Sequence, residues 1–488
     1  MSQQPTPPRN EQVGAIERAF SLGLVTSAAT AIVAVVRSKV VAIALGPAGV
    51  GMAAEINQVI TITNIPAALA GGPTLIKAVA RESTGKASPG EAQLAYDAAI
   101  SIGMLGSCLA IPVAVLITYL TLPPNWGGST STLTTIGGVT GCFVLLSTAQ
   151  AQVLIGAQKL REHSFATIAA NTVSVLTISA GVWWWGLRGL FGATLVAGVI
   201  SMILWGVVLR KSATPVRFRP RLNLSGTYAA EALRIGGGSL AGTLGTQVSL
   251  YMVRTALGRF EGPAANGLFQ ACWAIEGIFA QAVLVSLGNA IFPRYASAQA
   301  GKELTDELHE SARFLTRVVP PMMLMGIALR EIALPLLYTH EFRPAAPLLG
   351  LIFAGEIART MAWSRAGALL YRGKVRSYVL LQCLGSVLFG GGSMVLVPIV
   401  GIQGVGWAFV GTYSVHAFIN QFIVQRELGV PIIWPRVLGC YGALALAVAC
   451  SVALDYHPYV AVVPVVVSIV WAWRVGLVQR VLSRLRPR

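Results

Sequence analysis

Fourteen long apolar segments, joined by short polar loops, make up most of this chain of 488 residues. Each segment supplies about the 20 mostly apolar residues that an α-helix needs to cross a bilayer. No water satisfies backbone N–H and C=O groups in the hydrocarbon, so each span must be helical. The sequence therefore predicts an all-α polytopic membrane protein. The predicted spans are 17–45, 49–73, 94–121, 132–157, 164–186, 190–210, 229–257, 264–292, 314–338, 345–371, 377–400, 404–425, 436–454 and 459–478.

The composition agrees with this fold class. Hydrophobic residues make up 55% of the chain and charged residues 11%, with a mean hydropathy of +0.67, whereas soluble domains carry about 25% charged residues. The net charge of +17 does not indicate a nucleic-acid partner, because no basic tract is interleaved with aromatic residues. The six cysteines form no C-x-x-C pair and lie in apolar stretches, so we interpret them as small core residues.

Basic residues are concentrated in every second loop, which is the positive-inside pattern of a membrane protein. The intervening loops hold only Arg188, Arg259 and Arg343. We therefore expect a multi-pass protein with both termini in the cytoplasm. The polar N-terminus lacks the features of a cleavable signal peptide, so the first span is expected to act as the signal. The basic loops are 77–86, 159–161, 210–221, 294–302, 372–376 and 426–436, together with the tail 474–488.

The loops also predict a division into two halves. A basic, proline-containing stretch between the sixth and seventh spans indicates a linker, and the mixed charges of 293–313 indicate a short amphipathic surface helix. The predicted parts are a cytoplasmic tail (1–16), an N-terminal six-helix bundle (17–210), the linker (211–228), a C-terminal six-helix bundle (229–425), and two additional helices with a basic tail (426–488).

A short repeat supports two related halves. The first span ends in ALGPAGVG (44–51), and the seventh ends in ALGRFEGPAANG (256–267). Each copy has a basic residue before the turn and an acid on the helix after it. Both copies start on the same side of the membrane, so we expect a parallel repeat of the kind that transporters use. The charged residues in question are Lys39 and Glu55 in the first copy, and Arg254 and Glu276 in the second.

Seven basic residues lie inside the apolar segments or close to their ends. A charge in hydrocarbon costs about 2.5–3.5 kcal/mol on insertion scales, so these side chains should face a protein-lined, wet cavity. Since fewer acids share this zone, we expect a net cationic interior that suits an anion. The bases are Arg37, Lys39, Arg254, Arg317, Arg330, Arg359 and Arg365, with Arg234 as a borderline eighth, and the acids are Glu55, Glu276, Glu331 and Glu356.

Several of these residues have two open interpretations. Arg37 and Lys39 lie about 9–12 Å from the outer end of their span, and either bind a substrate or pair with acids such as Glu55. Arg254 either faces the cavity or extends to the outer interface. Arg317 either guides an anionic headgroup or extends to the cytoplasmic surface.

The span 345–371 carries a charged stripe that should face the cavity. Glu356 and Arg359 are three residues apart, which permits an ion pair within the helix, and Arg365 follows on the same helix. Glu276 is either a proton-coupling acid or a permanent partner of Arg254 or Lys39. Arg330, with Glu331, is expected to anchor its helix at the outer interface.

Enzyme and metal signatures are absent from the sequence. It holds no Walker A, H-E-x-x-H or G-x-S-x-G motif, and its five histidines have no ligand spacing. We therefore predict no catalytic residue, metal or cofactor. The energy for transport would come from an ion gradient, the membrane potential or the substrate gradient.

Three blocks of the chain resemble a known family. Residues 37–60, 252–296 and 338–382 are similar to the bacterial lipid-linked oligosaccharide flippases of the O-antigen and enterobacterial common antigen type. These flippases form the polysaccharide transporter branch of the multidrug/oligosaccharidyl-lipid/polysaccharide exporter superfamily. The charged positions that match the pattern are Lys39, Arg254, Glu276, Glu356 and Arg359, while Arg37 is added on charge alone.

The resemblance implies two six-helix bundles in a V around a central cavity. It implies a monomer in the bacterial cytoplasmic membrane that moves an undecaprenyl-diphosphate-linked oligosaccharide to the periplasmic leaflet by alternating access. H⁺ or Na⁺ would be the coupling ion and a glycan polymerase a partner. Arginine forks bind diphosphate bidentately, which fits a cationic cavity.

Three alternatives stay open at this point. The two extra spans also fit a peptidoglycan lipid II flippase, because those flippases have fourteen helices. A cation-coupled multidrug exporter would need an anionic cavity. A membrane glycan polymerase or glycosyltransferase would need a sizeable periplasmic loop, and the outer loops 121–132 and 338–347 are short.

Overall fold

The computed structural model describes residues 9–69, 72–85, 87–121, 130–212, 214–217, 227–280, 284 and 286–474. Within these residues the chain is helical and contains no strand. Among the described residues, eight helices are long and apolar enough to cross a membrane by length and composition. The prediction of an all-α polytopic membrane protein is therefore confirmed, whereas the V-shaped arrangement around a central cavity stays a prediction.

The chain forms two compact units. Unit 1 comprises Met1–Leu45 and Val59–Leu240, and unit 2 comprises Gly46–Gln58 and Ala241–Arg488. The short segment 46–58 therefore belongs to unit 2, although the chain on both sides of it belongs to unit 1. The division into a tail, two six-helix bundles, a linker and a terminal pair of helices stays a prediction.

Two long helices each contain two of the predicted spans. Helix α1 (Arg9–Leu69) bends at Gly46, and α5 (Leu160–Lys211) bends at Gly186. The φ angles of these glycines are 60° and 57°, a region that glycine enters without steric cost. Gly46 lies between the predicted spans 17–45 and 49–73, and Gly186 is the last residue of the predicted span 164–186, just before the span that begins at residue 190.

Within unit 1, α4 (Thr130–Gly156) packs against α5, α3 (Glu91–Thr121) and α2 (Gly72–Ser83). Helix α6 (Thr227–Phe260) begins in this unit. Helix α2 differs from the prediction, in which the second span extends to Pro73. Proline is favoured in the first turn of a helix, so Pro73 begins α2 rather than ending the preceding span.

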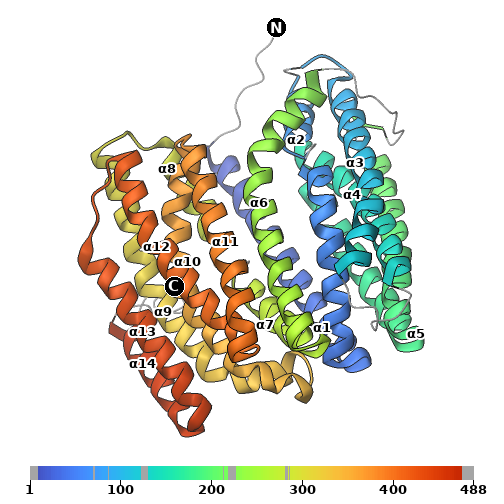
Figure 1. The fold of residues 1–488 in the computed structure, drawn as a ribbon. Helices are drawn as coiled ribbons and strands as arrows, with labels where there is room; N and C mark the ends of the chain where they lie inside the picture. Colours follow the sequence, from blue (N-terminus) through green and yellow to red (C-terminus); the bar gives the residue numbers. More distant parts are fainter. Residues whose placement is uncertain are drawn as a thin grey trace. The chain divides into compact units, whose positions relative to one another are not determined.

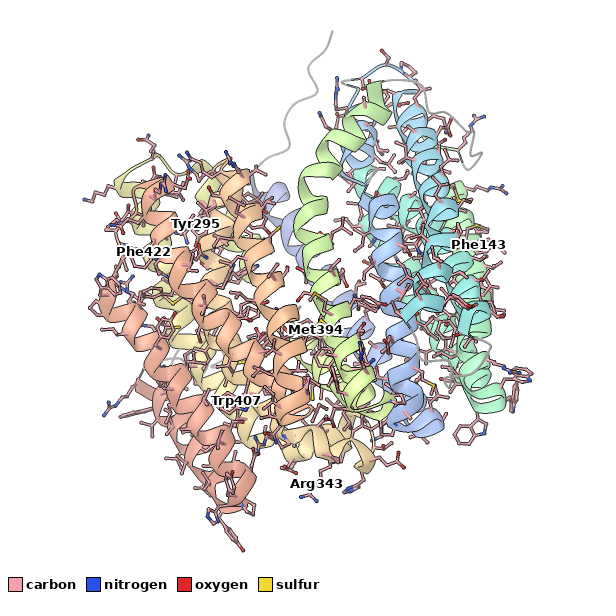
Figure 2. The ribbon with its side chains drawn as sticks, in the orientation of Figure 1. Phe143, Tyr295, Arg343, Met394, Trp407 and Phe422 are labelled. Carbon is pink, nitrogen blue, oxygen red and sulfur yellow. The ribbon has the colours of Figure 1, made fainter. Side chains whose placement is uncertain are left out.

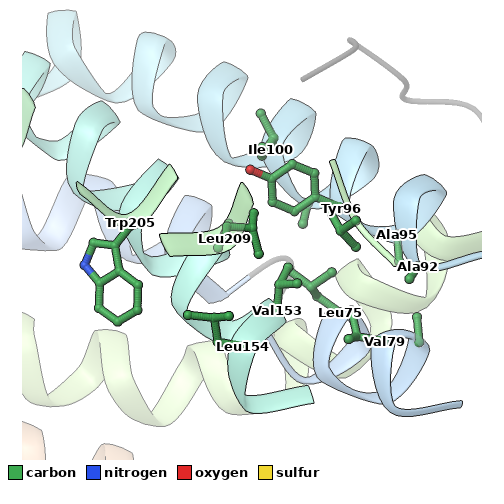
Figure 3. Close-up of a cluster of buried hydrophobic side chains, with 14 of the residues drawn as sticks. Leu75, Val79, Ala92, Ala95, Tyr96, Ile100, Val153, Leu154, Trp205 and Leu209 are labelled. Carbon is green, nitrogen blue, oxygen red and sulfur yellow. The ribbon is translucent and has the colours of Figure 1, made fainter. Parts of the chain in front are cut away.

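A cluster of buried apolar side chains holds α2 against its neighbours (Figure 3). Leu75 and Val79 of α2 pack with Tyr96 of α3, Val153 of α4 and Leu209 of α5. Small residues let the backbones approach closely here, as in other membrane helix pairs. This cluster lies at the ends of α3, α4 and α5.

Unit 2 is built around α10, which is buried over nearly all of its apolar length and lies beside α12 (Figure 1). Helices α9, α12 and α13 all pack against it. The predicted surface helix at 293–313 is instead divided between the end of α8 and the start of the long α9. The elements of this unit are α7 (Pro263–Phe279), α8 (Ser286–Ser297), α9 (Lys302–Leu337), η3 (His340–Ala345), α10 (Ala346–Tyr371), α11 (Val375–Val400), α12 (Gln403–Leu428), α13 (Trp434–Tyr456), η4 (Pro458–Ala461) and α14 (Val462–Arg474).

The two copies of the sequence repeat contact each other within unit 2. Each contains the motif G-P-A-x-x-G, starting at Gly46 and Gly262, and both of these glycines have positive φ angles. The last glycine of each motif lies against the proline carbonyl of the other. A Cβ on Gly51 would lie 1.9 Å from the Pro263 oxygen, and one on Gly267 would lie 1.8 Å from the Pro47 oxygen. Only glycine allows this backbone contact, which the repeat alone did not predict.

Candidate functional site

Beside this contact lies a network of buried polar side chains, here called the Arg254 cluster. Arg254 of α6 donates one hydrogen bond to Asn266 Oδ1 at 3.2 Å and another to Gln270 Oε1. Asn266 in turn donates to Glu55 Oε2 at 3.0 Å. The Arg254 guanidinium also lies 5.3 Å from the centre of the Phe269 ring. The cluster therefore balances one positive and one negative charge through a bridging amide.

The local sequence explains how this network forms. Asn266 and Gln270 are four residues apart on α7, so both side chains lie on the same helical face. Glu55 is brought close by the segment 46–58, which crosses α7 where Gly51 meets Gly267. Arg254 is buried rather than extended to the outer interface. The bridging Asn266 was missed, although a polar residue in an apolar span was a signal for it.

A second charged group, the Arg359 cluster, also lies in unit 2. Nη1 of Arg359 on α10 is 2.9 Å from Glu276 Oε1 on α7 and 2.9 Å from Glu356 Oε1 on the same helix. The side chain of Arg359 is 17% exposed, that of Glu276 is 3% exposed and that of Glu356 is fully buried, at 0%. The ion pair predicted within α10 is therefore confirmed. Glu276 pairs with Arg359, which was not among the partners that the sequence suggested for it, Arg254 and Lys39.

The Arg359 cluster contains two carboxyl groups and one guanidinium. With all three ionised its charge is −1, so this part of the interior does not have the cationic excess expected from the sequence. An uncompensated buried charge is costly. Two neighbouring carboxyl groups lower this cost when one of them takes a proton. The cluster is therefore electrically neutral after the uptake of one proton.

Aromatic side chains connect the two clusters. The ring of Trp273 lies 5.7 Å from that of Phe269 and 6.1 Å from that of Phe409. The Arg359 guanidinium lies 5.9 Å from the Phe409 ring and 5.8 Å from the Tyr413 ring. Such contacts stabilise a cation where water is scarce. The clusters thus belong to one continuous polar and aromatic interior.

A cavity of about 40 Å³ adjoins this interior. This volume exceeds the roughly 30 Å³ share of one water molecule and is far below the several hundred ångströms cubed of a typical ligand pocket. It can therefore hold water beside Tyr413 but not a sugar headgroup. Its polar and aromatic lining comes from α6, α7, α11 and α12 and includes Thr246, Ser249, Trp273, Gln382, Tyr413 and His416.

The other predicted site residues lie apart from these clusters. Arg37 is exposed and Lys39 half-buried, both on the part of α1 that belongs to unit 1. Arg365 is buried on α10, and two of its nitrogens, Nε and Nη2, have no hydrogen-bond partner among the described residues. Arg317 is exposed on α9. The side chain of Arg234 lies outside the described residues.

The prediction that Arg330 anchors its helix at the outer interface is wrong. Its side chain is 1% exposed and lies in the interior of unit 2. It donates to the backbone oxygen of Ser451 at 3.0 Å and to its hydroxyl at 2.9 Å, and it pairs with Asp455. Arg330 therefore joins α9 to α13. Its neighbour Glu331 pairs with Arg343 on the surface at 2.8 Å, where Figure 2 shows the Arg343 side chain at one end of the unit.

Comparisons with known proteins place this architecture in a family. Residues 40–347 match the family described as polysaccharide biosynthesis protein. The lipid III flippase of Escherichia coli (strain K12) is 20% identical over 386 residues, which cover 78% of this chain and 90% of that protein. The lipid III flippase of Shigella flexneri matches to the same extent.

Two solved transporters have a similar fold. An inward-facing multidrug resistance MATE family transporter of the MOP superfamily has a TM-score of 0.70 at 13% identity, covering 82% of this chain and 94% of that one. The lipid II flippase MurJ, in an inward closed conformation, has a TM-score of 0.69 at 10% identity. The similarity covers 95% of this chain and 99% of that one.

These findings confirm the resemblance to the exporter superfamily and the interpretation of the chain as a transporter rather than an enzyme. More than half of the chain matches the family. The matched residues include Glu55, Arg254, Asn266 and Glu276, whereas Glu356 and Arg359 lie beyond them on α10. The chain belongs to the polysaccharide biosynthesis protein family.

Proposed function

We propose that this protein is a flippase that moves an undecaprenyl-diphosphate-linked oligosaccharide from the cytoplasmic to the periplasmic leaflet by alternating access. The observation that carries the proposal is the pair of buried charged clusters on helices of a family whose relatives include lipid III flippases. A membrane protein that only needed stability would gain little from such groups, because buried ion pairs are often replaceable by apolar packing.

Arg254 and Arg359 are the proposed contacts for the diphosphate. Both guanidinium groups are engaged by protein oxygens, from Asn266, Glu276 and Glu356. A diphosphate offers the same planar groups a bidentate partner with more negative charge. Binding would therefore exchange the amide partners of Arg254 and the carboxylate partners of Arg359 for phosphate oxygens. Arg37 and Lys39, on the unit 1 part of α1, are proposed as further substrate-binding residues.

This exchange provides a route for coupling to protons. When a diphosphate draws Arg359 away, Glu276 and Glu356 lose their shared cation. Two adjacent carboxylates without a cation repel each other, so proton uptake follows. Water in the adjoining cavity of about 40 Å³ would supply the proton. Na⁺ is the alternative ion, bound by the same two carboxylates.

We also infer the setting in which the protein works. It would be a monomer in the bacterial cytoplasmic membrane, with both termini in the cytoplasm and a glycan polymerase as partner. The positive-inside pattern of the loops supports this orientation.

Lipid II is a second candidate cargo. The structural similarity to MurJ covers 95% of this chain, and so extends into the two C-terminal helices. A drug exporter is disfavoured by family membership rather than by charge, because the Arg359 cluster is not cationic.

Complementation of a flippase-deficient strain tests the proposal. Arg37→Ala, Lys39→Ala and the double variant should fail to restore glycan export while still inserting into the membrane. Arg188→Ala removes an exposed arginine beside the bend of α5 and serves as the control. Normal export by all three variants would remove Arg37 and Lys39 from the site.

A further inference from the structure

A groove of about 460 Å³ lies on the surface of unit 2 between α9 and α14. The two helices pack against each other at the edge of the unit (Figure 1). One wall is apolar and consists of Val466, Val470 and Trp471 of α14, whereas Arg317 of α9 and Arg474 of α14 supply two positive charges. The volume is within the range of about 300–1,000 Å³ that ligand pockets occupy. The lining therefore combines an apolar surface with a cationic end.

Two more arginines add to this positive charge. Arg313 precedes Arg317 by four residues and is exposed on the same helical face. Arg436, at the start of α13, is close enough to both for their charges to act on it. Among the described residues none of these side chains, nor Arg474, forms an ion pair. The acids one to two turns earlier on α9, Glu307 and Glu310, pair with Arg294 instead.

The positions along the helices place these charges at a membrane boundary. Arg317 lies twenty residues before Leu337 at the end of α9, and Arg436 lies twenty residues before Tyr456 at the end of α13. Twenty residues rise about 30 Å, which is the thickness of the hydrocarbon. Both arginines are therefore at the interface opposite to the helix ends beside Arg343. Figure 2 labels Arg343 at that other end of the unit. The loop charges predict that this interface is cytoplasmic.

We propose that this groove binds an anionic phospholipid of the cytoplasmic leaflet. Arg317 and Arg474 hold the phosphate, and one acyl chain lies along Val466, Val470 and Trp471. Basic pockets between membrane helices on the cytoplasmic side are suited to anionic headgroups. Val466 and Val470 are exposed on the surface of an apolar helix, and phospholipid is the abundant amphiphile around a membrane protein. The bound lipid fastens α14 to α9, and this role does not depend on which cargo the protein moves.

Native mass spectrometry of the full-length protein in mild detergent tests this site. Phosphatidylglycerol should be retained in preference to phosphatidylcholine with the same acyl chains. Since each arginine near the surface contributes on the order of a fivefold change in lipid affinity, Arg317→Gln or Arg474→Gln should weaken phosphatidylglycerol binding about fivefold, and the double variant about thirtyfold. Phosphatidylcholine binding should not change.

A matched control comes from the end of α5. Arg210 and Lys211 are exposed and lie in another of the basic loops, but they do not line the groove. The variant with both changed to Gln loses the same charge and should retain the wild-type preference for phosphatidylglycerol. Gel-filtration profiles check that every variant remains folded. If the double variant does not fold, the two single variants still test the site independently.

Two results would overturn the proposal. One is an equal loss of binding in the α5 control, which would mean that only total charge matters. The other is displacement of phosphatidylglycerol by farnesyl diphosphate at equal or lower concentration, which would assign the groove to a polyprenyl diphosphate. Neither result depends on a transport measurement, so this site can fail while the proposed function stands.

Discussion

Removal of the Arg359 guanidinium should destabilise the protein far more than removal of a surface arginine. In Arg359→Gln, Glu276 and Glu356 lose the nitrogen that lies 2.9 Å from each of them. Both carboxyl groups remain buried, with exposed fractions of 3% and 0%. Breaking a buried ion pair by deleting one partner costs about 3–5 kcal/mol, because the remaining charge is uncompensated.

The surface pair between Arg343 and Glu331 provides the comparison. Its distance of 2.8 Å is as short, but the two side chains are 61% and 41% exposed. Exposed pairs contribute about 0–1 kcal/mol. Arg343→Gln should therefore leave the thermal stability of the detergent-solubilised protein almost unchanged. The distance alone would predict the same effect for both variants, so the comparison isolates the contribution of burial.

A double-mutant cycle completes the test. Glu276→Gln alone leaves one carboxyl for one guanidinium, and its effect should be small. Added to Arg359→Gln, it removes one of the two unpaired carboxyl groups and should restore part of the lost stability. Thermal unfolding followed by tryptophan fluorescence measures all variants. If Arg359→Gln lost no more stability than Arg343→Gln, or if the cycle showed less than about 0.5 kcal/mol of coupling, the account of this cluster would be wrong.

Three further predictions concern single positions. Gly51→Ala places a Cβ 1.9 Å from a backbone oxygen and should reduce the yield of folded protein sharply, whereas Gly439→Ala, with no atom within 4 Å, should not; equal yields would contradict the crossing geometry. In Glu276→Gln, the charges of Glu356 and Arg359 cancel without a bound proton, so the transport rate should vary less between pH 5 and 8 than in the wild type. An unchanged dependence of the transport rate on pH would leave Glu276 a structural partner. Arg330→Met leaves Asp455 without its cation and should lower the melting temperature by several degrees, while a value equal to wild type would argue against this tie between α9 and α13.

The apolar segments made the helices predictable, because length and hydropathy are local properties. The bend of α1 lies at Gly46 and Pro47, which were predicted to form a turn between two spans. The start of α2 was missed, because a proline such as Pro73 either ends a helix or begins one, and the neighbouring residues do not decide between the two. The repeat was visible in the sequence, but the contact between its two copies depends on tertiary packing.

The charged sites show the same limit. Glu356 and Arg359 were paired correctly because three residues on a helix fix their separation. The partner of Glu276 could not be predicted, since it depends on how α7 meets α10. Asp455 was overlooked because it lies one residue beyond the predicted end of its span, so the burial of Arg330 had no visible explanation.

Reconstitution into proteoliposomes tests the central claim most directly. A fluorescent oligosaccharide linked to undecaprenyl diphosphate would be placed in one leaflet, and a membrane-impermeant quencher would measure how much of the headgroup crosses. We predict that the protein accelerates crossing well above protein-free vesicles and that the lipid is recovered chemically unchanged. Crossing no faster than in protein-free vesicles, with correctly inserted protein, would contradict the proposed function, and a covalently altered lipid would indicate an enzyme instead.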